Sequence, residues 1–298
     1  MPSLKVPLFT LTIISINCLV HGLVFIAEPI LSNFTINARN VIYLKEYYRI
    51  VTSAFIHANL MHLGFNMMST LAIAGNLESE LGTLWMAFTT LWSVFLCGAF
   101  YVAIQWLAFA LEIGGSFEEH LYTQAVGFSG VIFCFAVMES FKSAQPNRSV
   151  FGLFLVPTKI YPWVLLVVLQ FIMPGISFEG HLGGALLGLL HSFDIFSFLI
   201  PSLQMIKVIE DWKMIKFLSL RFDSFVVCPS EQHHEATVSY LKSFVNLFKG
   251  LWAALKYLGM IVFWVVTATL HILGCYISRD TVEYDRVAQN DVELAGMP

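Results

Sequence analysis

A serine and a histidine stand at the starts of two separate apolar stretches of the sequence, each among glycines. Ser129 lies within Gly127-Phe128-Ser129-Gly130, and His181 lies within Gly180-His181-Leu182-Gly183-Gly184. A serine hydroxyl becomes a nucleophile when a neighbouring imidazole accepts its proton. The two motifs therefore predict a nucleophile and its general base, provided that the fold brings the two stretches together.

A third polar segment carries His57, His62 and Asn66 at the start of another apolar stretch. His62 and Asn66 are four residues apart, so a helix would place them on one face. The three side chains could bind a metal ion instead. Asparagine is a poor ligand for transition metals, however, and no glutamate or cysteine completes a set. The sequence therefore predicts no metal and no cofactor.

The composition indicates that lipid surrounds most of the chain. The sequence has 298 residues, of which 57% are hydrophobic and only 12% are charged, unlike an ordinary soluble domain. The net charge is -4, and no basic patch is interleaved with aromatic residues, so a nucleic-acid partner is excluded. The five cysteines are scattered singly, which favours packed thiols over a disulfide framework or a zinc cluster.

Seven charge-poor stretches approach the roughly 20 residues that cross a bilayer as a helix. They are Val6–Ala27, Leu60–Leu77, Leu81–Leu111, Val126–Met138, Ile160–Met173, His181–Ile200 and Tyr257–Ser278. The first could be a signal peptide, but no small-residue cleavage site is obvious after it. The predicted fold is an all-α polytopic membrane protein. Residues 1–200 form a six-helix core, 201–256 a polar cytosolic linker, 257–278 a seventh transmembrane helix and 279–298 a polar tail.

The distribution of basic residues predicts the orientation in the membrane, because lysine and arginine favour the cytosolic side of short loops. Lys142, Arg148 and Lys159 lie between the fourth and fifth stretches, whereas Lys45 and Arg49 give a weaker opposing signal. We therefore expect a cytosolic amino terminus. The second, fourth and sixth helices then start on the lumenal side. Polar side chains in the first turns of these three helices should then lie at the same depth in the membrane. They are His62, Asn66, Ser129 and His181.

Each of these residues also has a purely structural interpretation. Ser129 between glycines could serve close helix packing, as small residues commonly do in membranes. His181 could be a histidine at a helix start near the interface. The glycines at 180, 184 and 188 are spaced by four residues, which lets a helix press its backbone onto a neighbour. An ionisable residue at membrane depth nevertheless indicates function, and the joint occurrence of the motifs favours a catalytic site.

Together these motifs resemble those of the rhomboid family of intramembrane serine proteases. The resemblance rests on the segment from His57 to Asn66, on Gly127-Phe128-Ser129-Gly130, and on His181 with Gly184 and Gly188. It covers roughly Tyr43 to Leu190, and Tyr48-Arg49 is similar to the Trp-Arg pair usual in the family. Pro174 to Phe178 is similar to the corresponding segment of Golgi-type eukaryotic members.

The resemblance implies a role for each matching residue. Ser129 would attack the peptide carbonyl, and His181 would accept its proton. The oxyanion would be bound by the backbone N–H of Ser129 and by the His62 and Asn66 side chains. Phe133 matches a position where relatives often carry tyrosine, the ring on which the histidine stacks. Gly127, Gly130, His57, Gly184 and Gly188 would support the site.

The resemblance also implies a Ser-His dyad without a third member. Asp194 is thirteen residues beyond His181, about 20 Å along a helix, and Glu139 is about 15 Å beyond Ser129. The implied substrates are single-pass membrane proteins cleaved near the lumenal membrane face. The implied location is the endomembrane system, Golgi or endoplasmic reticulum, with the plasma membrane as an alternative. The sequence indicates no oligomeric state.

Two other functions are compatible with a polytopic membrane chain. One is a catalytically inactive rhomboid-like protein that binds or escorts membrane clients. Such relatives usually lack the serine or the histidine, or place proline before the serine, whereas Phe128 precedes Ser129 here. The other is a transporter, which would be expected to show internal repeats and broken helices in matched halves. The sequence shows no such repeats.

The predicted orientation can be tested with two glycosylation sequons, Asn33-Phe34-Thr35 and Asn147-Arg148-Ser149. Sequons are used only on the lumenal side of the secretory pathway, and these two lie in opposite loops. In a eukaryotic cell we expect Asn33→Gln to remove any glycan-dependent mass shift and Asn147→Gln to change nothing. A glycan on Asn147 would invert the protein and place Ser129 and His181 on the cytosolic side.

Overall fold

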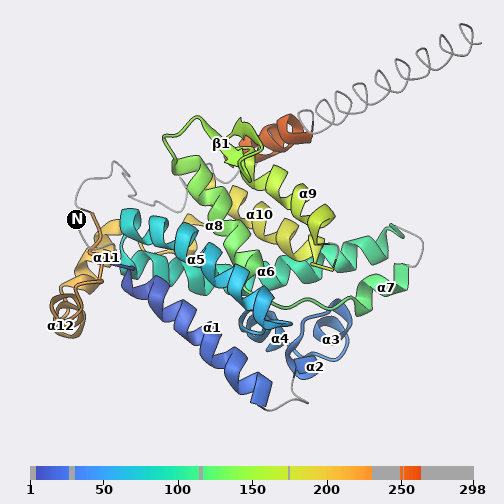
Figure 1. Ribbon diagram of the computed structural model, residues 1–298, viewed down its shortest axis with the longest axis horizontal. Helices are drawn as coiled ribbons and strands as arrows, with labels where there is room; N and C mark the ends of the chain where they lie inside the picture. The colour runs from blue at the N-terminus through green and yellow to red at the C-terminus, as the bar shows by residue number, and fades with distance from the viewer. Residues whose placement is uncertain are drawn as a thin grey trace, which may run out of the picture. The chain divides into compact units, whose positions relative to one another are not determined.

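The computed structural model describes residues 5–26, 31–113, 117–173, 175–229, 249–250 and 252–262 of the chain. The described residues are mostly helical (Figure 1). Contacts divide the chain into two compact units, residues 1–251 and 252–298. The described part of the second unit is an apolar helix, Trp252–Val262. The predicted seventh helix, Tyr257–Ser278, and the tail after it therefore lie largely outside the described residues.

The first unit is built from helices of very different lengths and one β-hairpin. In chain order they are α1 (Leu8–Ile26), α2 (Leu31–Phe34), α3 (Ala38–Ile42), α4 (Arg49–Thr52), a 3-10 turn (Ser53–Phe55), α5 (Leu60–Leu81), α6 (Thr83–Ala110), α7 (Phe117–Tyr122), α8 (Ser129–Lys142), β1 (Asn147–Val150), β2 (Phe154–Pro157), α9 (Tyr161–Ile172), α10 (Phe178–Ser192), a 3-10 turn (Ser197–Leu199), α11 (Leu203–Glu210) and α12 (Lys213–Arg221). The two strands are antiparallel, with Asn147 opposite Pro157 and Val150 opposite Phe154.

Length and composition make two of the described helices, α1 and α6, long and apolar enough to cross a membrane. The helix α9 and the helix 252–262 are apolar but shorter. The predicted stretches Val6–Ala27, Leu81–Leu111 and Ile160–Met173 coincide with α1, α6 and α9 to within two residues at each end.

The helix α5 starts at Leu60 as predicted, but α5 and α8 run to Leu81 and Lys142, four residues beyond the predicted ends, and α10 begins at Phe178, three residues before the predicted start. Two larger or functionally placed differences come from single residues with unusual backbone angles. The fourth helix was expected to start at Val126, but Gly127 has φ +114° and α8 begins only at Ser129. The sixth was expected to reach Ile200, but α10 ends at Ser192 and Asp194 has φ +59°. A residue with positive φ cannot continue a right-handed helix.

The helices α8 and α10 lie side by side at the centre of the first unit (Figure 1). A Cβ atom at Gly184 would overlap the carbonyl oxygen of Gly130, and one at Gly188 would overlap that of Cys134. The two glycines therefore let the backbones touch without intervening side chains, as small residues do between membrane helices. This contact sets the separation and the register of α8 and α10.

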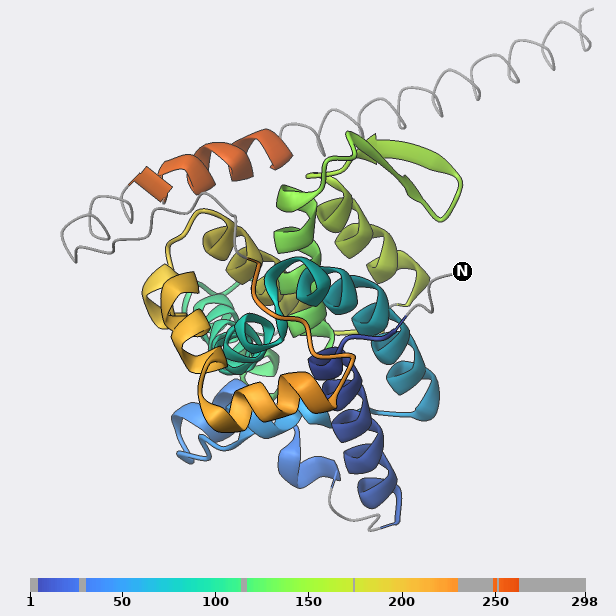
Figure 2. The same ribbon diagram turned by 90° about the vertical axis from the view of Figure 1, so that its left-hand side faces the viewer.

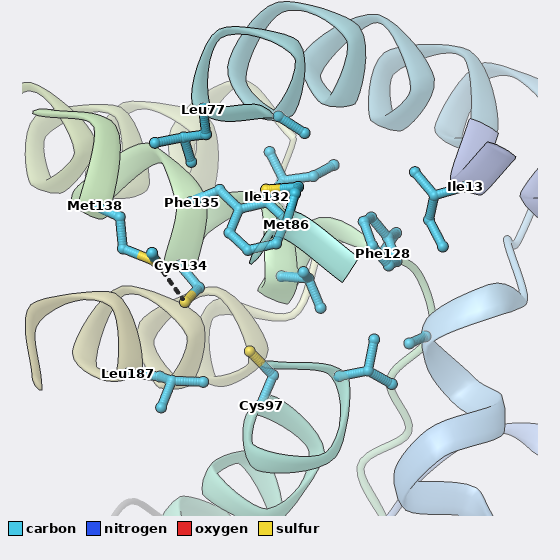
Figure 3. Close-up of a cluster of buried hydrophobic side chains, with 14 of the residues drawn as sticks. Ile13, Leu77, Met86, Cys97, Phe128, Ile132, Cys134, Phe135, Met138 and Leu187 are labelled. Atoms are coloured by element: carbon cyan, nitrogen blue, oxygen red, sulfur yellow. Dashed lines mark hydrogen bonds between the residues drawn. The ribbon is translucent and has the colours of Figure 1, made fainter. Parts of the chain in front are cut away.

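A cluster of buried apolar side chains surrounds this pair (Figure 3). Phe128 and Phe135 belong to α8 and the turn before it, and both are at most 1% exposed. They pack with Leu77 of α5, Met86 of α6 and Leu187 of α10. These four helices thus converge on one core, which holds the start of α8 in place.

A buried carboxylate joins the N-terminal end of α1 to the end of α5. Glu78 has no exposed surface. Its oxygens accept hydrogen bonds from the backbone N–H groups of Phe9 and Thr10, at 2.8 and 2.7 Å, and from the hydroxyls of Thr10 and Thr83, both at 2.7 Å. A carboxylate at a helix N-terminus satisfies N–H groups that have no partner within the helix.

The segment after α12, which the sequence predicts as part of a polar linker, packs against the same junction. Ser224 accepts the Leu8 N–H at 2.8 Å, and Val226 pairs with Thr83 through both of its backbone groups. Lys5 and Asp223 form an ion pair that lowers the pKa of the Asp223 carboxyl. Figure 2 shows this orange stretch passing the N-terminal end of α1. Residues up to Cys228 are therefore held to the helical core.

Candidate active site

Ser129 and His181 form a hydrogen bond across the contact between α8 and α10. The distance between His181 Nε2 and Ser129 Oγ is 2.8 Å. Ser129 is the first residue of α8, and His181 lies in the first turn of α10. Because the glycines fix the two helices at backbone contact, the serine and histidine meet with no further movement. The pair has the geometry that a nucleophile and its general base require.

The turn that leads into α8 presents Ser129 at the helix start. Gly127, with φ +114°, donates its N–H to the Ser53 carbonyl at 2.9 Å. Phe128 is fully buried and directs its N–H toward His57 Nε2 at 3.5 Å. His57, 1% exposed, thus contacts the backbone immediately before Ser129 rather than the serine itself. The N–H of Ser129 lies at the helix N-terminus, where backbone donors lack an intrahelical partner.

The imidazole of His181 is oriented by an aromatic ring. Phe133, one turn after Ser129, stacks on His181 with ring centroids 4.7 Å apart and planes inclined by 26°. Within the described residues, His181 Nδ1 has no hydrogen-bond partner. The carboxylate of Glu139 pairs with Arg148 instead, and Asp194 lies beyond the far end of α10. The described geometry is therefore a Ser-His pair without a carboxylate.

His62 presents a hydrogen-bond donor beside Ser129. Its Nδ1 accepts the Ala58 N–H at 3.4 Å, so a neutral ring carries its proton on Nε2. A Cβ atom at Gly127 would lie 2.9 Å from that Nε2. Glycine at this position therefore serves two needs, the positive φ and the close approach of the His62 ring. The Nε2–H is placed where it could bind an oxyanion formed at Ser129.

Asn66 lies one turn further along α5 and is used differently. Its Nδ2 donates to the backbone carbonyl of His62 at 2.8 Å, and the residue is 5% exposed. His62 is among the residues lining the cavity at Ser129, whereas Asn66 is not among them. The structure thus brings His62 to the serine and keeps Asn66 behind it, bonded to the same turn.

A cavity of about 420 Å³ opens beside the serine. Its polar wall includes Ser129, His181, His62 and Asn59, and its apolar wall includes Met61, Cys97, Tyr101 and Met173. The volume falls in the range of small-molecule and peptide subsites. Among the residues that the structure describes, no group of three or more histidines, cysteines or carboxylates is arranged to hold a metal ion.

The loop between α1 and α5 is pinned over this site by a buried arginine. Arg49 is 4% exposed and donates to the carbonyls of Ser32 and Thr35, at 2.9 and 2.7 Å, and to Glu46 at 2.6 Å. Ile36, the residue after Thr35, exchanges two backbone hydrogen bonds with Ala125: each residue donates its N–H to the carbonyl of the other. The loop is therefore attached to the segment that leads into α8.

Several residues that position the site were not singled out from the sequence. Asn59 caps α5 by accepting the His62 N–H at 2.8 Å, and Ser177 caps α10 by accepting the Gly180 N–H at 3.1 Å. Both caps could have been found, because serine or asparagine immediately before an apolar stretch is a typical helix start. The carbonyl of Ser53 carries no such signal, since any residue could supply it.

Comparison with known proteins agrees with the motifs. Residues 44–198 match a family model described as the Rhomboid domain. The chain is 34% identical to Rhomboid-like protein 15 of Arabidopsis thaliana over 186 residues, 61% of this chain and 45% of the relative. It is 37% identical to Rhomboid-related protein 4 of Homo sapiens over 149 residues, 50% of this chain and 46% of the relative.

A fungal relative is matched over more of its length. Rhomboid-type serine protease 2 of Neurospora crassa is 28% identical over 215 residues, which cover 70% of this chain and 73% of the relative. The chain spans about half the length of the plant and human relatives. The matched region of the family model contains His62, Asn66, Ser129 and His181.

The backbone contact between α8 and α10 predicts opposite effects for two glycine substitutions. Gly184→Ala adds a Cβ that overlaps the Gly130 carbonyl and should lower the free energy of unfolding by about 1–3 kcal/mol. Gly64→Ala on α5 meets nothing within 4 Å and should leave stability unchanged or raise it by up to about 1 kcal/mol. Thermal unfolding in detergent measures both. Equal melting temperatures for the two variants would contradict the described contact.

Proposed function

Because the chain belongs to the rhomboid family, we propose that it is an intramembrane serine endopeptidase in which Ser129 is the nucleophile and His181 the general base. The observation that carries the proposal is the 2.8 Å hydrogen bond between His181 Nε2 and Ser129 Oγ at the wall of a cavity. The alternative is an inactive rhomboid-like protein that binds or escorts clients. A binding protein has no need of an activated serine, so the pair favours catalysis.

The proposed reaction proceeds through an acyl-enzyme. Ser129 Oγ attacks the peptide carbonyl carbon while His181 Nε2 takes its proton. His181 then returns that proton to the leaving amine as the peptide bond breaks. A water molecule attacks the ester in the same way and releases Ser129. General-base assistance of this kind contributes about 10²- to 10⁴-fold to the rate, and the Phe133 ring keeps the imidazole aligned for both transfers.

The negative charge of the tetrahedral intermediate would be bound by donors already in place. The Ser129 N–H at the start of α8 and the His62 Nε2–H are the two donors next to the nucleophile. Donors fixed in advance cost no reorganisation when the charge develops, and each contributes about 10²- to 10³-fold. Asn66 would act through the same turn of α5, either by holding His62 or by rotating its amide toward the oxyanion.

The proposed membrane arrangement has six core spans and one more after the linker. The six are α1, α5, α6, α8, α9 and α10. The helices α8 and α10 have 14 and 15 residues, about 21 to 23 Å at 1.5 Å per residue. They are shorter than the hydrocarbon layer of about 30 Å. Irregular backbone before each helix is tolerated at depth where protein buries it, and Ser129 and His181 would lie at such ends.

The proposed substrates are single-pass membrane proteins cut near the lumenal face. A peptide bond within a helix is shielded by its own hydrogen bonds, so small or helix-breaking residues would help the substrate unwind toward Ser129. The loop from residue 31 to Phe55 and the segment between α9 and α10 border the cavity and would control entry. The proposed location is the endomembrane system, consistent with the Golgi-type resemblance of the segment before α10.

The catalytic assignment predicts that Ser129→Ala and His181→Ala each abolish cleavage of a transmembrane substrate while the protein stays folded. Both residues take part in one proton transfer, so the double variant should be no worse than either single variant. Ser140→Ala, a buried serine on the same helix whose hydroxyl bonds to the Val137 carbonyl, is the matched control. Wild-type turnover by Ser129→Ala would exclude the proposed function.

The positions of His62 and Asn66 predict graded losses of different size. His62→Ala should lower kcat by about 10²-fold because it removes a donor that faces the nucleophile. Asn66→Ala should lower it less, since the described amide bonds to a backbone carbonyl. Substrate cleavage in proteoliposomes gives both values. A larger loss for Asn66→Ala than for His62→Ala would show that Asn66, and not His62, is the main side-chain donor.

A further inference from the structure

A chain of four buried or half-buried polar groups connects α6 and α7 to the segment that leads into the nucleophile. The Tyr101 hydroxyl donates to the Thr123 carbonyl at 2.7 Å, and Gln105 Nε2 donates to the Tyr101 oxygen at 3.2 Å. His120 Nδ1 lies 3.2 Å from Gln105 Oε1, and His120 Nε2 lies 2.8 Å from the Ile113 carbonyl. Tyr101 is 2% exposed and Gln105 has no exposed surface.

The direction of these hydrogen bonds determines the protonation of His120. The Thr123 carbonyl can only accept, so the Tyr101 hydroxyl must donate to it. Tyr101 then accepts from Gln105, which must turn its NH₂ toward the tyrosine and its oxygen toward His120. The oxygens of Gln105 and Ile113 are both acceptors, so both ring nitrogens of His120 must donate. Only the imidazolium donates from both nitrogens. A neutral ring leaves one nitrogen lone pair facing an oxygen.

The segment held by this network positions the catalytic serine. Thr123 begins a stretch of seven residues that ends at Ser129. Along it, Ala125 pairs with Ile36 through N···O distances of 2.9 and 3.0 Å, and the Gly127 N–H bonds to Ser53. Tyr101 itself lines the cavity. A shift of the Thr123 carbonyl would therefore be transmitted along a short, extended backbone to the turn at Gly127.

We propose that His120, in its protonated form, is a positioning residue that holds the segment from Thr123 to Gly127 through Gln105 and Tyr101, and thereby makes the placement of Ser129 dependent on pH. The network is fully paired when both ring nitrogens carry a proton. When a rise in pH removes one of these protons, the ring loses one donor and the network loses one hydrogen bond. The segment is therefore tighter at acidic pH and looser at alkaline pH.

The charged groups on the elements packed around His120 are mainly acidic. Helix α6 carries no charged residue over its length, and α7 carries Glu118 and Glu119 beside the histidine. Glu112 lies in the turn after α6. The only charged residue of α3, which packs against α7, is Arg39, whose guanidinium lies over the Tyr122 ring at 5.5 Å. With three carboxylates and one guanidinium, the segments around His120 carry a net negative charge.

Amide hydrogen exchange of the full-length protein tests the proposal without any substrate. The reporters are the N–H groups of Ala125 and Gly127, compared at about pH 5.5 and about pH 8 after correction for intrinsic exchange. In the wild type we expect protection to fall by about fivefold at the higher pH, the worth of one hydrogen bond. His120→Gln should show no such fall, because glutamine does not titrate. His191→Gln, a histidine at the far end of α10, is the matched control and should behave as the wild type.

Two further variants separate the charge from the connection. His120→Arg carries a permanent charge with several donors and should keep its protection at about pH 8. Gln105→Leu keeps His120 but removes the connection, and its protection should be low and independent of pH. The proposal is overturned if the wild type and His120→Gln lose protection equally, if His120→Arg falls as steeply as the wild type, or if Gln105→Leu keeps the pH dependence.

The kinetic consequence rests on the proposed function and is measured separately. With a transmembrane substrate, kcat of the wild type should fall about tenfold on the alkaline side with little change in KM, because the nucleophile is displaced rather than the substrate released. His120→Arg should not show this fall. An alkaline fall of equal size in His120→Arg would overturn the proposal. Absence of cleavage in every variant would contradict the proposed function, and the exchange experiment would still decide the role of His120.

Discussion

Two carbonyl oxygens of α8, those of Gly130 and Cys134, lie against the backbone of α10 at positions where a Cβ atom would overlap them. Everything at the site depends on this contact. It fixes the separation of the two helices, and the first turn of each then carries one member of the Ser129–His181 pair. In lipid the hydrophobic effect cannot drive two helices together, so close packing of small residues has to supply the attraction. The same glycines that allow the two helices to touch therefore set the distance between Ser129 and His181.

A second constraint is that polar groups buried in such a core need partners. In this chain single side chains supply the partners, some from nearby residues and some from distant ones. Asn59 and Ser177 cap the helices that carry His62 and His181, Arg49 takes up the carbonyls of the loop above the cavity, and Glu78 takes up the free N–H groups of α1. The first three of these interactions also fix elements that carry or border the candidate site. The backbone of the site is thus preorganised before any substrate binds, which is the main requirement for stabilising a developing charge.

Much of this arrangement could be predicted from the sequence because it depends on periodicity. The spacing of four residues between Gly180, Gly184 and Gly188 indicates a close helix contact, and the three apolar stretches with polar starts indicate a shared depth. The start of α8 and the end of α10 could not be predicted, since they depend on the backbone angles of Gly127 and Asp194. The packing of residues 222–228 on the core was also hidden, because its hydrogen bonds come from backbone groups that every sequence possesses.

The side chains of α5 show the remaining limit of sequence reasoning. His62 and Asn66 are equivalent by helical spacing, yet one lines the cavity and the other bonds back to its own helix. Likewise the pairing of His120 with Gln105 joins residues fifteen positions apart across a turn, and no local pattern signals it. Side-chain rotamers and contacts across turns depend on how the whole chain packs. They could therefore be identified only from the structure.

We propose that the imidazole of His181 activates Ser129 in the folded protein. Labelling with a serine-directed fluorophosphonate, followed by identification of the modified peptide, is the most direct test of this activation. We expect covalent modification of Ser129 alone in the native protein, and its loss after heat denaturation or in His181→Ala. Labelling that persists in His181→Ala, or that falls on another serine, would show that His181 does not activate Ser129.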